Sequence, residues 1–327
     1  MRKDREVNLF RRRFYIPPSK IRIKNYIRET PSVAFNPAVL LDEKKVFIFP
    51  RLIFDYYEYT SSIGVFEIDL DDLLNGKVDR VFETEILLWP SDITDFLGCE
   101  DPRIHLHDDT IYMLYTGKGY ELGDTTESKR IDYLYLAKMN RNFEILEKRY
   151  FRVLKDDGEL VIPLSNKDSA FIEIEGEKAT MLTRPMMERG NLFCYSAVAD
   201  LENMILHDLR VIMKPEEWEY KVGWSTNVVK MRDGEYLVGW HAVLRRDLSY
   251  RSGFAIVNGK GELIAVSDYT LFPSNLNEEY GDRALVIFGD GLLLVEDEIV
   301  WIGGVGDYSI GIFIANLKDV LQNMRNV

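Results

Sequence analysis

The chain has 327 residues, of which 46% are hydrophobic and 12% aromatic, and its 54 acidic and 41 basic side chains give a formal net charge of -13. This hydrophobic content excludes a disordered chain, and the absence of a run of 18 apolar residues argues against a membrane-spanning segment. Because the net negative charge repels phosphate backbones, we expect no nucleic-acid partner and no membrane partner.

The N-terminal residues 1–18 form a basic segment in an acidic protein. The segment lacks the apolar core of about 7 to 15 residues that a secretory signal needs, so we expect a cytoplasmic protein. As a basic arm it is a candidate for docking on a neighbouring subunit, which would make the protein a homo-oligomer. The two cysteines, Cys99 and Cys194, are too few for a disulfide framework or a zinc site and are expected to be small packing residues.

Beyond the arm, one pattern recurs five times along the chain. Each copy begins with a polar or charged residue, continues through an apolar stretch and a short acidic or glycine-bearing turn, and ends in a second apolar stretch. The copies cover residues 35–51, 100–117, 167–184, 226–241 and 289–304. The matching residues at their starts lie 59 to 67 positions apart: Asn36, Asp101, Asp168, Asn227 and Asp290.

Two apolar stretches around a tight turn predict a β-hairpin. The five predicted turns lie at residues 42–43, 108–109, 175–176, 233–234 and 296–297. Further strand-like segments between the hairpins include residues 63–70, 131–139, 193–199 and 252–258. Helix is scarce: one short helix is expected near the C-terminus, at residues 316–324, and a shorter one at residues 69–76.

Four strands repeating about every 63 residues predict an all-β chain, with five propeller blades of four strands each. We expect residues 1–327 to form a single five-bladed β-propeller domain. A two-domain α/β fold would need amphipathic crossover helices between the strands, and the sequence contains too few of them.

A propeller brings equivalent residues of its blades together around the central channel. A hairpin starts and ends at the same end of a blade, so the starting residues named above should lie near the residues that end the copies. Those are Arg51, Thr116, Arg184, His241 and Asp307. Acids and bases gathered around one axis suit a ligand that carries both hydroxyl groups and a negative charge.

Each of these residues also has a purely structural reading. Asp101 precedes Pro102 and could shape a turn, while Lys167 and Asp168 could form a surface ion pair. His241 lies in an apolar context, where a buried structural histidine is common, and Asp307 sits in a glycine-rich loop.

Other motifs of the sequence do not indicate a site. The stretch from His105 to Asp109 contains residue types that bind metals, at a spacing that places the two histidines on one face of a strand. Its aspartates are needed for the hairpin turn, so we expect no metal site. The sequence has no glycine-rich phosphate loop, nucleophile elbow or HExxH motif, so it does not predict nucleotide hydrolysis, serine esterase or zinc peptidase chemistry.

Several of these stretches together resemble glycoside hydrolase family 130, the β-mannoside phosphorylases. The similar motifs occur in the family's order from about residue 35 to the C-terminus: "FNPAV" (35–39), "GCEDPRI" (98–104), "NKDSAF" (166–171), "LTRP" (182–185), "GWHAV" (239–243), "YRSGFAI" (250–256) and "GGVGDYSIGI" (303–312).

The resemblance implies a five-bladed propeller and inverting phosphorolysis of β-1,4-linked mannosides to α-mannose 1-phosphate, with inorganic phosphate as co-substrate and no cofactor. It makes Asp101 the general acid, delivering its proton through a sugar hydroxyl. Positions similar to the family's phosphate contacts are Lys167, Arg184, His241 and Tyr250. Positions similar to its sugar contacts are Asn36, Arg51, Arg103, Asp168 and Asp307.

The chemistry is consistent with these residue types. An inverting hydrolase needs an acid and a carboxylate base that activates water, whereas phosphate is already an anion and needs cationic donors to hold it. Two alternatives stay open: an inverting β-mannosidase with Asp168 or Asp307 as base, and a sugar-binding propeller without catalysis.

The sequence departs from the family pattern in its last two copies. The fourth reads "WSTNVVKM", where small residues and prolines are common, which puts the local loop shape in doubt. The fifth reads "FGDG", where a cysteine commonly precedes the glycine, and Asp290 has no assigned role.

Overall fold

The computed structural model describes residues 2–121, 129–188, 190–232 and 234–327. The regular structure of the chain is almost entirely β-strand, so the all-β prediction is confirmed. Among the described residues no helix is long and apolar enough to cross a membrane. The three α-helices of these residues are short: α1 (Leu70–Leu74), α2 (Leu276–Glu279) and α3 (Leu317–Gln322). Two of them fall where the sequence predicts helix, and a 3-10 turn covers Pro18–Lys20.

The strands follow one another as antiparallel meanders. The first two meanders form one sheet, joined by a single pair between Ser61 and Gly98. The first comprises β3 (Val33–Asp42), β4 (Lys45–Ile53), β5 (Ser61–Asp69) and β6 (Phe82–Leu88), with β2 (Ile21–Ile23) beside β6. The second comprises β7 (Gly98–His107), β8 (Thr110–Tyr120), β9 (Arg130–Met139) and β10 (Ile145–Tyr150).

The other meanders each form a separate sheet. The third comprises β13 (Asn166–Glu175), β14 (Lys178–Pro185), β15 (Cys194–Asp200) and β16 (Ile205–Met213), extended by β11 (Arg152–Leu154) and β12 (Leu160–Val161). The fourth comprises β17 (Glu219–Arg232), β18 (Glu235–Leu244), β19 (Tyr250–Asn258) and β20 (Leu263–Ser267), extended by β24 (Met324–Asn326). The fifth comprises β21 (Ile287–Val295), β22 (Glu298–Val305) and β23 (Ser309–Asn316), with β1 (Arg12–Ile16) at its edge.

The five predicted hairpins are the first two strands of the five meanders. The turn predicted at residues 233–234 falls between β17 and β18, and Asp233 itself lies outside the described residues. The predicted strands at residues 63–70, 131–139, 193–199 and 252–258 correspond to β5, β9, β15 and β19.

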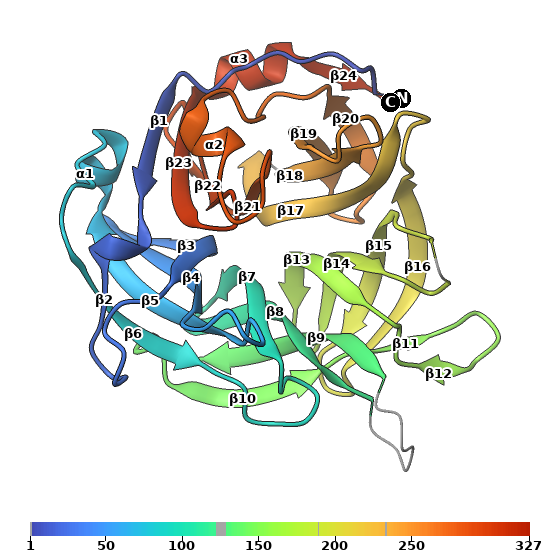
Figure 1. Cartoon of the computed structure of the whole chain (residues 1–327). Coiled ribbons are helices and arrows are strands. Elements are labelled where there is room, and N and C mark those ends of the chain that lie inside the picture. Colours follow the sequence, from blue (N-terminus) through green and yellow to red (C-terminus); the bar gives the residue numbers. More distant parts are fainter. Residues whose placement is uncertain (1, 122–128, 189, 233) are drawn as a thin grey trace.

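The meanders are arranged in a ring around a common centre (Figure 1). Their first strands contact one another in cyclic order, β3 with β7, β7 with β13, β13 with β17, β17 with β21, and β21 with β3. Hydrophobic clusters fill the spaces between neighbouring meanders, such as the cluster of Ile48 and Ile302 between the first and the fifth. No sheet of the described residues closes on itself, so the number of blades stays a prediction.

The N-terminal segment packs on its own chain. Strand β1 pairs with β23 in antiparallel register, with Arg12 opposite Ile314. Nearer the N-terminus, the guanidinium of Arg2 forms a buried ion pair with Glu219 and lies over the ring of Trp240. Residues 12–16 thus have their backbone paired within the chain, and the side chain of Arg2 is buried, while docking of the segment on a neighbouring subunit stays a prediction.

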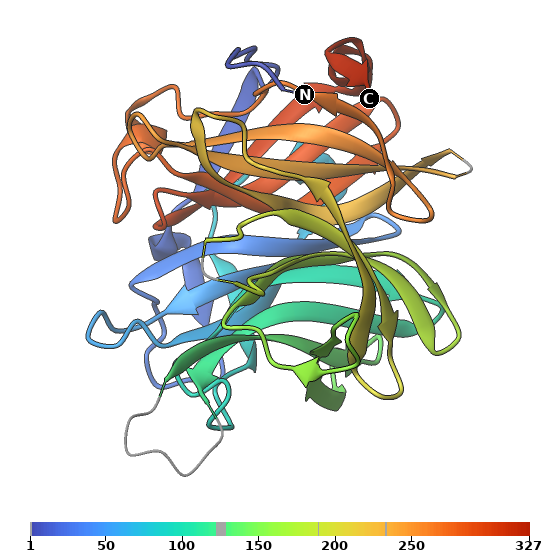
Figure 2. The same ribbon diagram turned by 90° about the vertical axis from the view of Figure 1, so that its right-hand side faces the viewer.

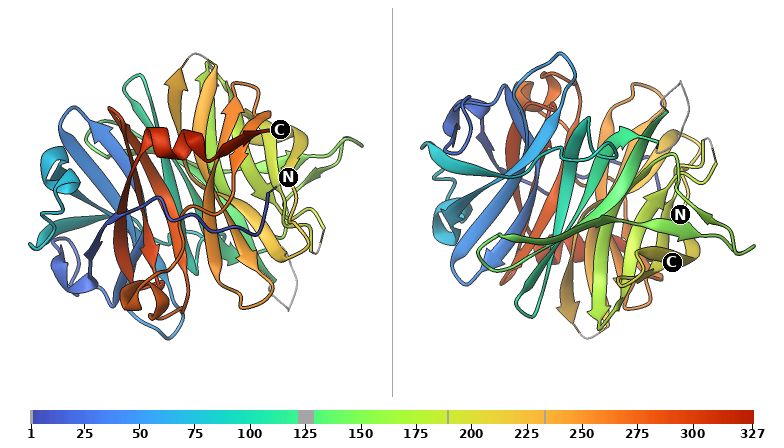
Figure 3. Two further views of the ribbon diagram at one scale, coloured as in Figure 1. Left: turned by 90° about the horizontal axis from the view of Figure 1, so that it is seen from above. Right: turned by 90° about the horizontal axis from the view of Figure 1, so that it is seen from below.

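The two ends of the chain lie close together, as all views show (Figures 1, 2 and 3). The N-terminal segment and the C-terminal α3 and β24 run over the same side of the ring (Figure 3). Cys99 and Cys194 are free, buried thiols within hydrophobic clusters, so the prediction of packing residues is confirmed.

Candidate functional site

The first strand of every meander is bulged at the position that the repeat aligns. The pairing register shifts between Phe35 and Ala38 in β3, and the same irregularity recurs in β7, β13, β17 and β21. A bulge turns one side chain away from the regular alternation. Three of the aligned residues have left-handed backbone, with φ of 43° at Asn36, 50° at Asp101 and 54° at Asp168. Asn and Asp are the side chains that tolerate this conformation best after glycine.

The bulges of β3, β7 and β13 open onto a cavity of about 270 Å³. Nine of the ten predicted site residues line it: Asn36, Arg51, Asp101, Lys167, Asp168, Arg184, His241, Tyr250 and Asp307. Six further lining residues were not predicted: Glu100, Lys118, Lys221, Arg283, Val286 and Phe288. Hairpin ends that are equivalent in the repeat, such as Asp101, Arg184 and His241, therefore converge at this cavity.

Asp101 is held by two side chains from the first meander. The amide Nδ2 of Asn36 donates a hydrogen bond of 2.9 Å to Asp101 Oδ1. The guanidinium of Arg51 donates to the same oxygen from Nη1 at 3.3 Å and to Glu100 Oε1 from Nη2 at 2.8 Å. Both contacts fix the Asp101 carboxyl by one oxygen.

Asp168 forms the centre of a second cluster. Arg184 donates from Nε to Asp168 Oδ2, and Nε2 of His241 lies 3.9 Å from the same oxygen. Burial opposes ionisation of Asp168, but the charges of Arg184 and Arg103 outweigh it and lower its pKa. Asp168 is therefore an ionised carboxylate at neutral pH.

Gly223 allows this cluster to form. A Cβ at residue 223 would lie 2.6 Å from Asp168 Oδ2, 2.6 Å from His241 Cε1 and 3.0 Å from Arg184 Nε. These contacts are too short for any side chain, so the backbone of β17 approaches the cluster only because the residue is glycine.

His241 lies deep in the cavity wall. Its Nδ1 is 3.0 Å from the hydroxyl of Ser225, and its ring stacks on Tyr250 with centroids 5.6 Å apart. Burial lowers the pKa of His241 well below its ordinary value, so the imidazole is neutral at pH 7. Nε2 is buried and has no hydrogen-bond partner among the described residues. A buried polar atom without a partner that faces a cavity is a candidate contact for a ligand.

The remaining lining residues are mostly cations. Lys167 lies 3.2 Å from Asp132 and 3.7 Å from Glu100, and Lys118 lies 3.7 Å from Glu100. Burial raises the pKa of Glu100, but Arg51, Lys167 and Lys118 lower it to about 2 overall. Lys221 donates to the hydroxyl of Tyr250 at 3.0 Å. The lining holds six Lys and Arg side chains against four carboxylates, in a protein whose net charge is -13.

Asp307 enters the cavity from the loop between β22 and β23, again with left-handed backbone (φ 49°). Burial raises the pKa of Asp307 from its ordinary 3.8 to about 6, although Arg51 and Arg283 oppose the shift. The pKa of the Asp307 carboxyl thus lies close to neutral pH.

Arg103 does not line the cavity, which differs from the prediction that it contacts sugar. It lies behind the wall, 3% exposed, and donates to the carbonyls of Ser225 and Asp101 at 2.7 and 2.8 Å. Its Nη2 lies 2.8 Å from Asp290 and 3.5 Å from Asp168. The physical reason is the bulge in β7, which inserts a residue between Glu100 and Arg103 and so moves Arg103 off the face that Asp101 occupies.

The aligned residues of the last two meanders are also structural. Asn227 exchanges two hydrogen bonds with the backbone of Leu292, at 3.1 and 2.7 Å, and so joins β17 to β21. Asp290 is fully buried beside Arg103. Of the five repeated positions, three thus face the cavity and two hold the inner strands together.

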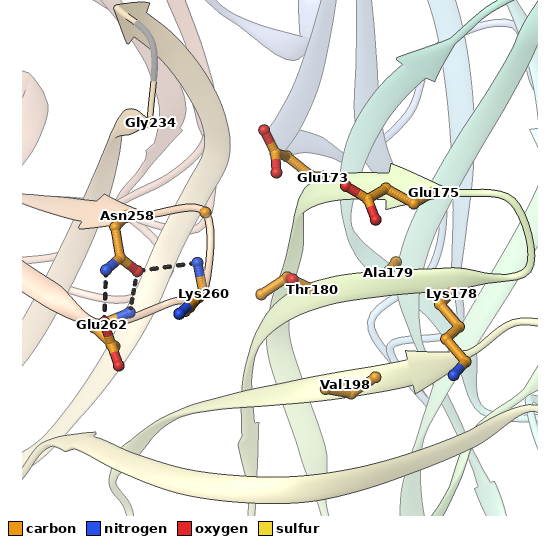
Figure 4. A pocket seen from close by; sticks show the side chains of 11 residues that line it. Glu173, Glu175, Lys178, Ala179, Thr180, Val198, Gly234, Asn258, Lys260 and Glu262 are labelled. Atoms are coloured by element: carbon orange, nitrogen blue, oxygen red, sulfur yellow. Dashed lines mark hydrogen bonds between the residues drawn. The ribbon is translucent and has the colours of Figure 1, made fainter.

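Among the described residues outside this cavity, no second cluster of predicted site residues is present. In the part of the chain that the structure describes, no group of three or more His, Cys, Asp or Glu is arranged to hold a metal. A second cavity, of about 580 Å³, lies at the hairpin-turn ends of the third and fourth meanders (Figure 4). Its Asn258 uses its side chain to bond Lys260 and Glu262 of its own turn, so these polar groups serve the turn.

Comparison with known families assigns the chain to the mannoside phosphorylases. It belongs to glycoside hydrolase family 130, because the family model described as beta-1,4-mannooligosaccharide phosphorylase matches residues 1–326. A curated relative, the 1,2-beta-oligomannan phosphorylase of Thermoanaerobacter sp. (strain X514), is 29% identical over 275 residues, which cover 81% of this chain and 82% of the relative.

Solved structures share the fold. The beta-1,2-mannobiose phosphorylase from Listeria innocua, in complex with beta-1,2-mannobiose, superimposes with a TM-score of 0.71 at 19% identity, covering 95% of this chain and 99% of that one. MPT-4, a mannose phosphorylase from Leishmania mexicana in complex with phosphate ion, gives a TM-score of 0.60 at 12% identity, covering 98% and 92%.

Proposed function

We propose that this protein is an inverting phosphorylase that cleaves β-linked mannosides with inorganic phosphate to give α-mannose 1-phosphate, with Asp101 as general acid. The observation that carries the proposal is the excess of cations in the lining of a cavity that belongs to an acidic protein. A net positive cavity attracts and holds an anion, and phosphate is the anion that this reaction consumes.

The geometry around Asp101 supports its role as acid. Arg51 and Asn36 hold one carboxyl oxygen, Oδ1, and the side chain borders the cavity. A general acid has to be held in one orientation toward the group it protonates. In the proposed reaction the proton reaches the leaving oxygen through a sugar hydroxyl, as the family resemblance implies, and the bond from C1 to that oxygen breaks as phosphate bonds C1 from the opposite face.

The phosphate subsite is proposed on the side of the cavity formed by Lys167, Arg184, His241 and Tyr250. The unpartnered Nε2 of the neutral His241 can donate to an oxygen of phosphate when Nδ1 accepts from Ser225. Lys221 and Arg283 add positive charge next to Tyr250. Sugar contacts are proposed for Asn36, Arg51, Asp168 and Asp307.

We further propose that the ring of meanders is a single domain, a five-bladed β-propeller. Cyclic contact of the five first strands and a hydrophobic cluster between each pair of neighbours support this count. In a propeller the central strands of all blades deliver side chains to one axial site.

The linkage of the substrate has two candidates. The β-1,4 linkage expected from the resemblance agrees with the description of the matching family model, whereas the named relatives from Thermoanaerobacter and Listeria act on β-1,2-linked mannosides. The test therefore uses both disaccharides. We expect incubation with β-1,4- or β-1,2-mannobiose and phosphate to yield mannose 1-phosphate from one of them, measured by chromatography.

The second candidate is an inverting β-mannosidase with Asp307 as base, because the raised pKa of Asp307 suits a general base. The dependence of the reaction on phosphate distinguishes the phosphorylase from this hydrolase. Equal release of mannose with and without phosphate would establish the hydrolase instead. For the phosphorylase, Arg184→Ala should raise the KM for phosphate about tenfold or more, because a charged donor is lost. Arg232→Ala, at an exposed ion pair with Glu235, is the matched control and should leave that KM unchanged.

Asp101→Asn provides the test of the acid. Loss of a general acid lowers kcat by about 10²- to 10⁴-fold, and asparagine keeps the shape of the side chain. Turnover by Asp101→Asn at the unmodified rate would remove Asp101 from the mechanism and favour a sugar-binding protein without catalysis.

A further inference from the structure

One cation of the cavity comes from an irregular segment of the chain. Arg283 lies in the loop of residues 272–286, which precedes β21 and contains the short helix α2. We call this segment the Arg283 loop. The other five Lys and Arg side chains of the lining extend from strands: Arg51 on β4, Lys118 on β8, Lys167 on β13, Arg184 on β14 and Lys221 on β17.

The side chain of Arg283 has little to hold it. Its residue is exposed, and its guanidinium forms no hydrogen bond or ion pair with any residue that the structure describes. The guanidinium carbon lies 5.8 Å from the centre of the Tyr250 ring. A long side chain without a partner is free to adopt many rotamers, and a ligand must restrict it. The place of Arg283 at the cavity therefore depends on the backbone of its loop.

The half of the loop nearest the cavity is fixed by backbone contacts. The N–H of Arg283 donates to the carbonyl of Gly306 at 2.9 Å, and the carbonyl of Leu285 accepts from the N–H of Tyr250 at 3.0 Å. The N–H of Leu285 donates to the carbonyl of Glu279, the last residue of α2, at 3.2 Å. This bond joins the two halves of the loop, so a displacement of α2 is transmitted to the backbone around Arg283.

Helix α2 has no hydrophobic side chain that would anchor it. It has only four residues, too few to be stable alone, and its Leu276 is 77% exposed, as is 76% of Tyr280 directly after it. The residue that α2 buries is Glu278, which is 0% exposed. A buried carboxylate is costly unless it is paired, and it fixes a position more strictly than an apolar contact does. The helix is thus held by a charge.

Glu278 is fully paired, and most of its donors come from β1. Nη1 of Arg13 lies 2.6 Å from both carboxyl oxygens, and the hydroxyl of Tyr15 donates to Oε1 at 2.7 Å. The N–H of Ser274, within the loop, donates to Oε2 at 2.8 Å. Helix α2 accordingly lies beside β1 (Figure 1). Because β1 is paired with β23, these bonds attach the loop to the fifth meander.

The anchor keeps its protonation state over the pH range of an assay. Burial and the hydrogen bond to Glu278 raise the pKa of Tyr15 to about 12, so its hydroxyl remains a donor at neutral pH. The guanidinium of Arg13 is charged at any such pH. The contact therefore acts as a permanent clamp on the loop.

We infer that Glu278 is a positioning residue for the binding of phosphate. Together with Arg13 and Tyr15 it holds the Arg283 loop, and thereby keeps Arg283 at the cavity next to Tyr250. This inference rests on the proposed function, and it adds the N-terminal strand β1 to the parts of the chain that set the affinity for phosphate.

The test is a double-mutant cycle read out as kcat and as the KM for phosphate. Arg283→Ala should raise this KM about fivefold and change kcat less than about twofold, because the lost charge acts on bound phosphate before and during the reaction alike. Glu278→Gln removes the ion pair, keeps the shape of the side chain and should raise the KM as much. The variant with both substitutions should have the KM of Arg283→Ala alone, because Glu278 acts through Arg283.

Phe10→Ala is the matched control for loss of stability. Phe10 precedes β1, and its ring packs against Phe254, Trp301 and Phe313, none of which lines the cavity. This variant should unfold more easily and keep the KM for phosphate. If Glu278→Gln does not fold, Tyr15→Phe replaces it in the cycle, since it removes one hydrogen bond to Glu278 and should raise the KM about twofold.

Two results would overturn the inference. One is an unchanged KM for phosphate when the clamp is broken. The other is a cycle in which the two effects multiply, because Glu278 would then act on something other than Arg283. If no mannoside is phosphorolysed, the proposed function fails instead, and hydrogen exchange still tests the clamp. Glu278→Gln should speed exchange of the amide of Arg283 about tenfold or more, and an unchanged rate would show that the loop does not need Glu278.

Discussion

Asp307 is a carboxyl of the cavity whose pKa is raised toward neutral pH. Its pKa is about 6 in the folded protein and near the ordinary 3.8 when unfolded, so the folded state binds the extra proton between these values. The free energy of unfolding contributed by this group is therefore fully present below pH 4 and is lost as the pH rises through 6. Asp307→Asn should raise the unfolding midpoint at pH 8 and leave it nearly unchanged at pH 4, measured by thermal denaturation.

The control for this prediction is Asp109→Asn at the turn between β7 and β8, where the side chain is 94% exposed, and it should not reproduce the pH-dependent gain. An equal gain for Asp307→Asn at both pH values would contradict the raised pKa. Because Asp307 lines the cavity, the same substitution is expected to lower activity, as is common where a buried charge is kept for function.

At the level of single residues, the repeat and the family motifs located most of the site. They identified Asn36, Asp101 and Asp168 because equivalent positions converge. They could not show which way the side chain of Arg103 points. The bulge in β7 depends on backbone pairing across the hairpin, and it leaves no recognisable pattern in the amino-acid sequence. Lys118 and Lys221 were missed for a related reason: they lie outside the aligned positions, and only the twist and bending of the strands bring them to the cavity.

Among the elements, β1 differs most from what the sequence suggested. Basic residues at 11–13 favour a solvated arm, yet the strand completes the fifth meander, and Phe10 just before it is buried against Phe254, Trp301 and Phe313. The alternation that would mark an edge strand is too short here to be read. Helix α2 was missed because four residues carry no periodic pattern.

Phe10→Ala tests whether this segment belongs to the fold. Removing a buried phenylalanine ring should lower the free energy of unfolding by about 3–5 kcal/mol, measured by urea denaturation. Ile27→Ala, at a side chain that is 91% exposed, is the control and should change it by less than about 0.5 kcal/mol. A loss for Phe10→Ala as small as the control's would mean that the segment is detached in solution.

For the molecule as a whole, Arg103 joins four of the five meanders. It extends from β7 to Ser225 on β17, Asp168 on β13 and Asp290 on β21. Such a buried network holds the inner strands at fixed positions around the cavity. The sequence could predict that these strands converge. It could not predict the partners of Arg103, because these depend on how far neighbouring meanders are shifted relative to one another along the central axis.

A double-mutant cycle measures this network. Arg103→Met should destabilise the protein by about 3–5 kcal/mol, because it leaves buried carboxylates without their partner. Adding Asp290→Asn should restore part of the loss, so that the double variant is more stable than the sum of the single effects implies. Arg22→Met, which breaks an exposed pair with Glu83, is the control and should cost about 1 kcal/mol or less. Strict additivity would contradict a coupled network.

The pairing of β1 with β23 also sets an order of events during synthesis. The ribosome makes residues 12–16 well before their partner strand, residues 309–316. Strand β1 therefore stays without its partner β23 while the intervening meanders are made, and a chain stopped before residue 309 lacks the strand with which β1 pairs.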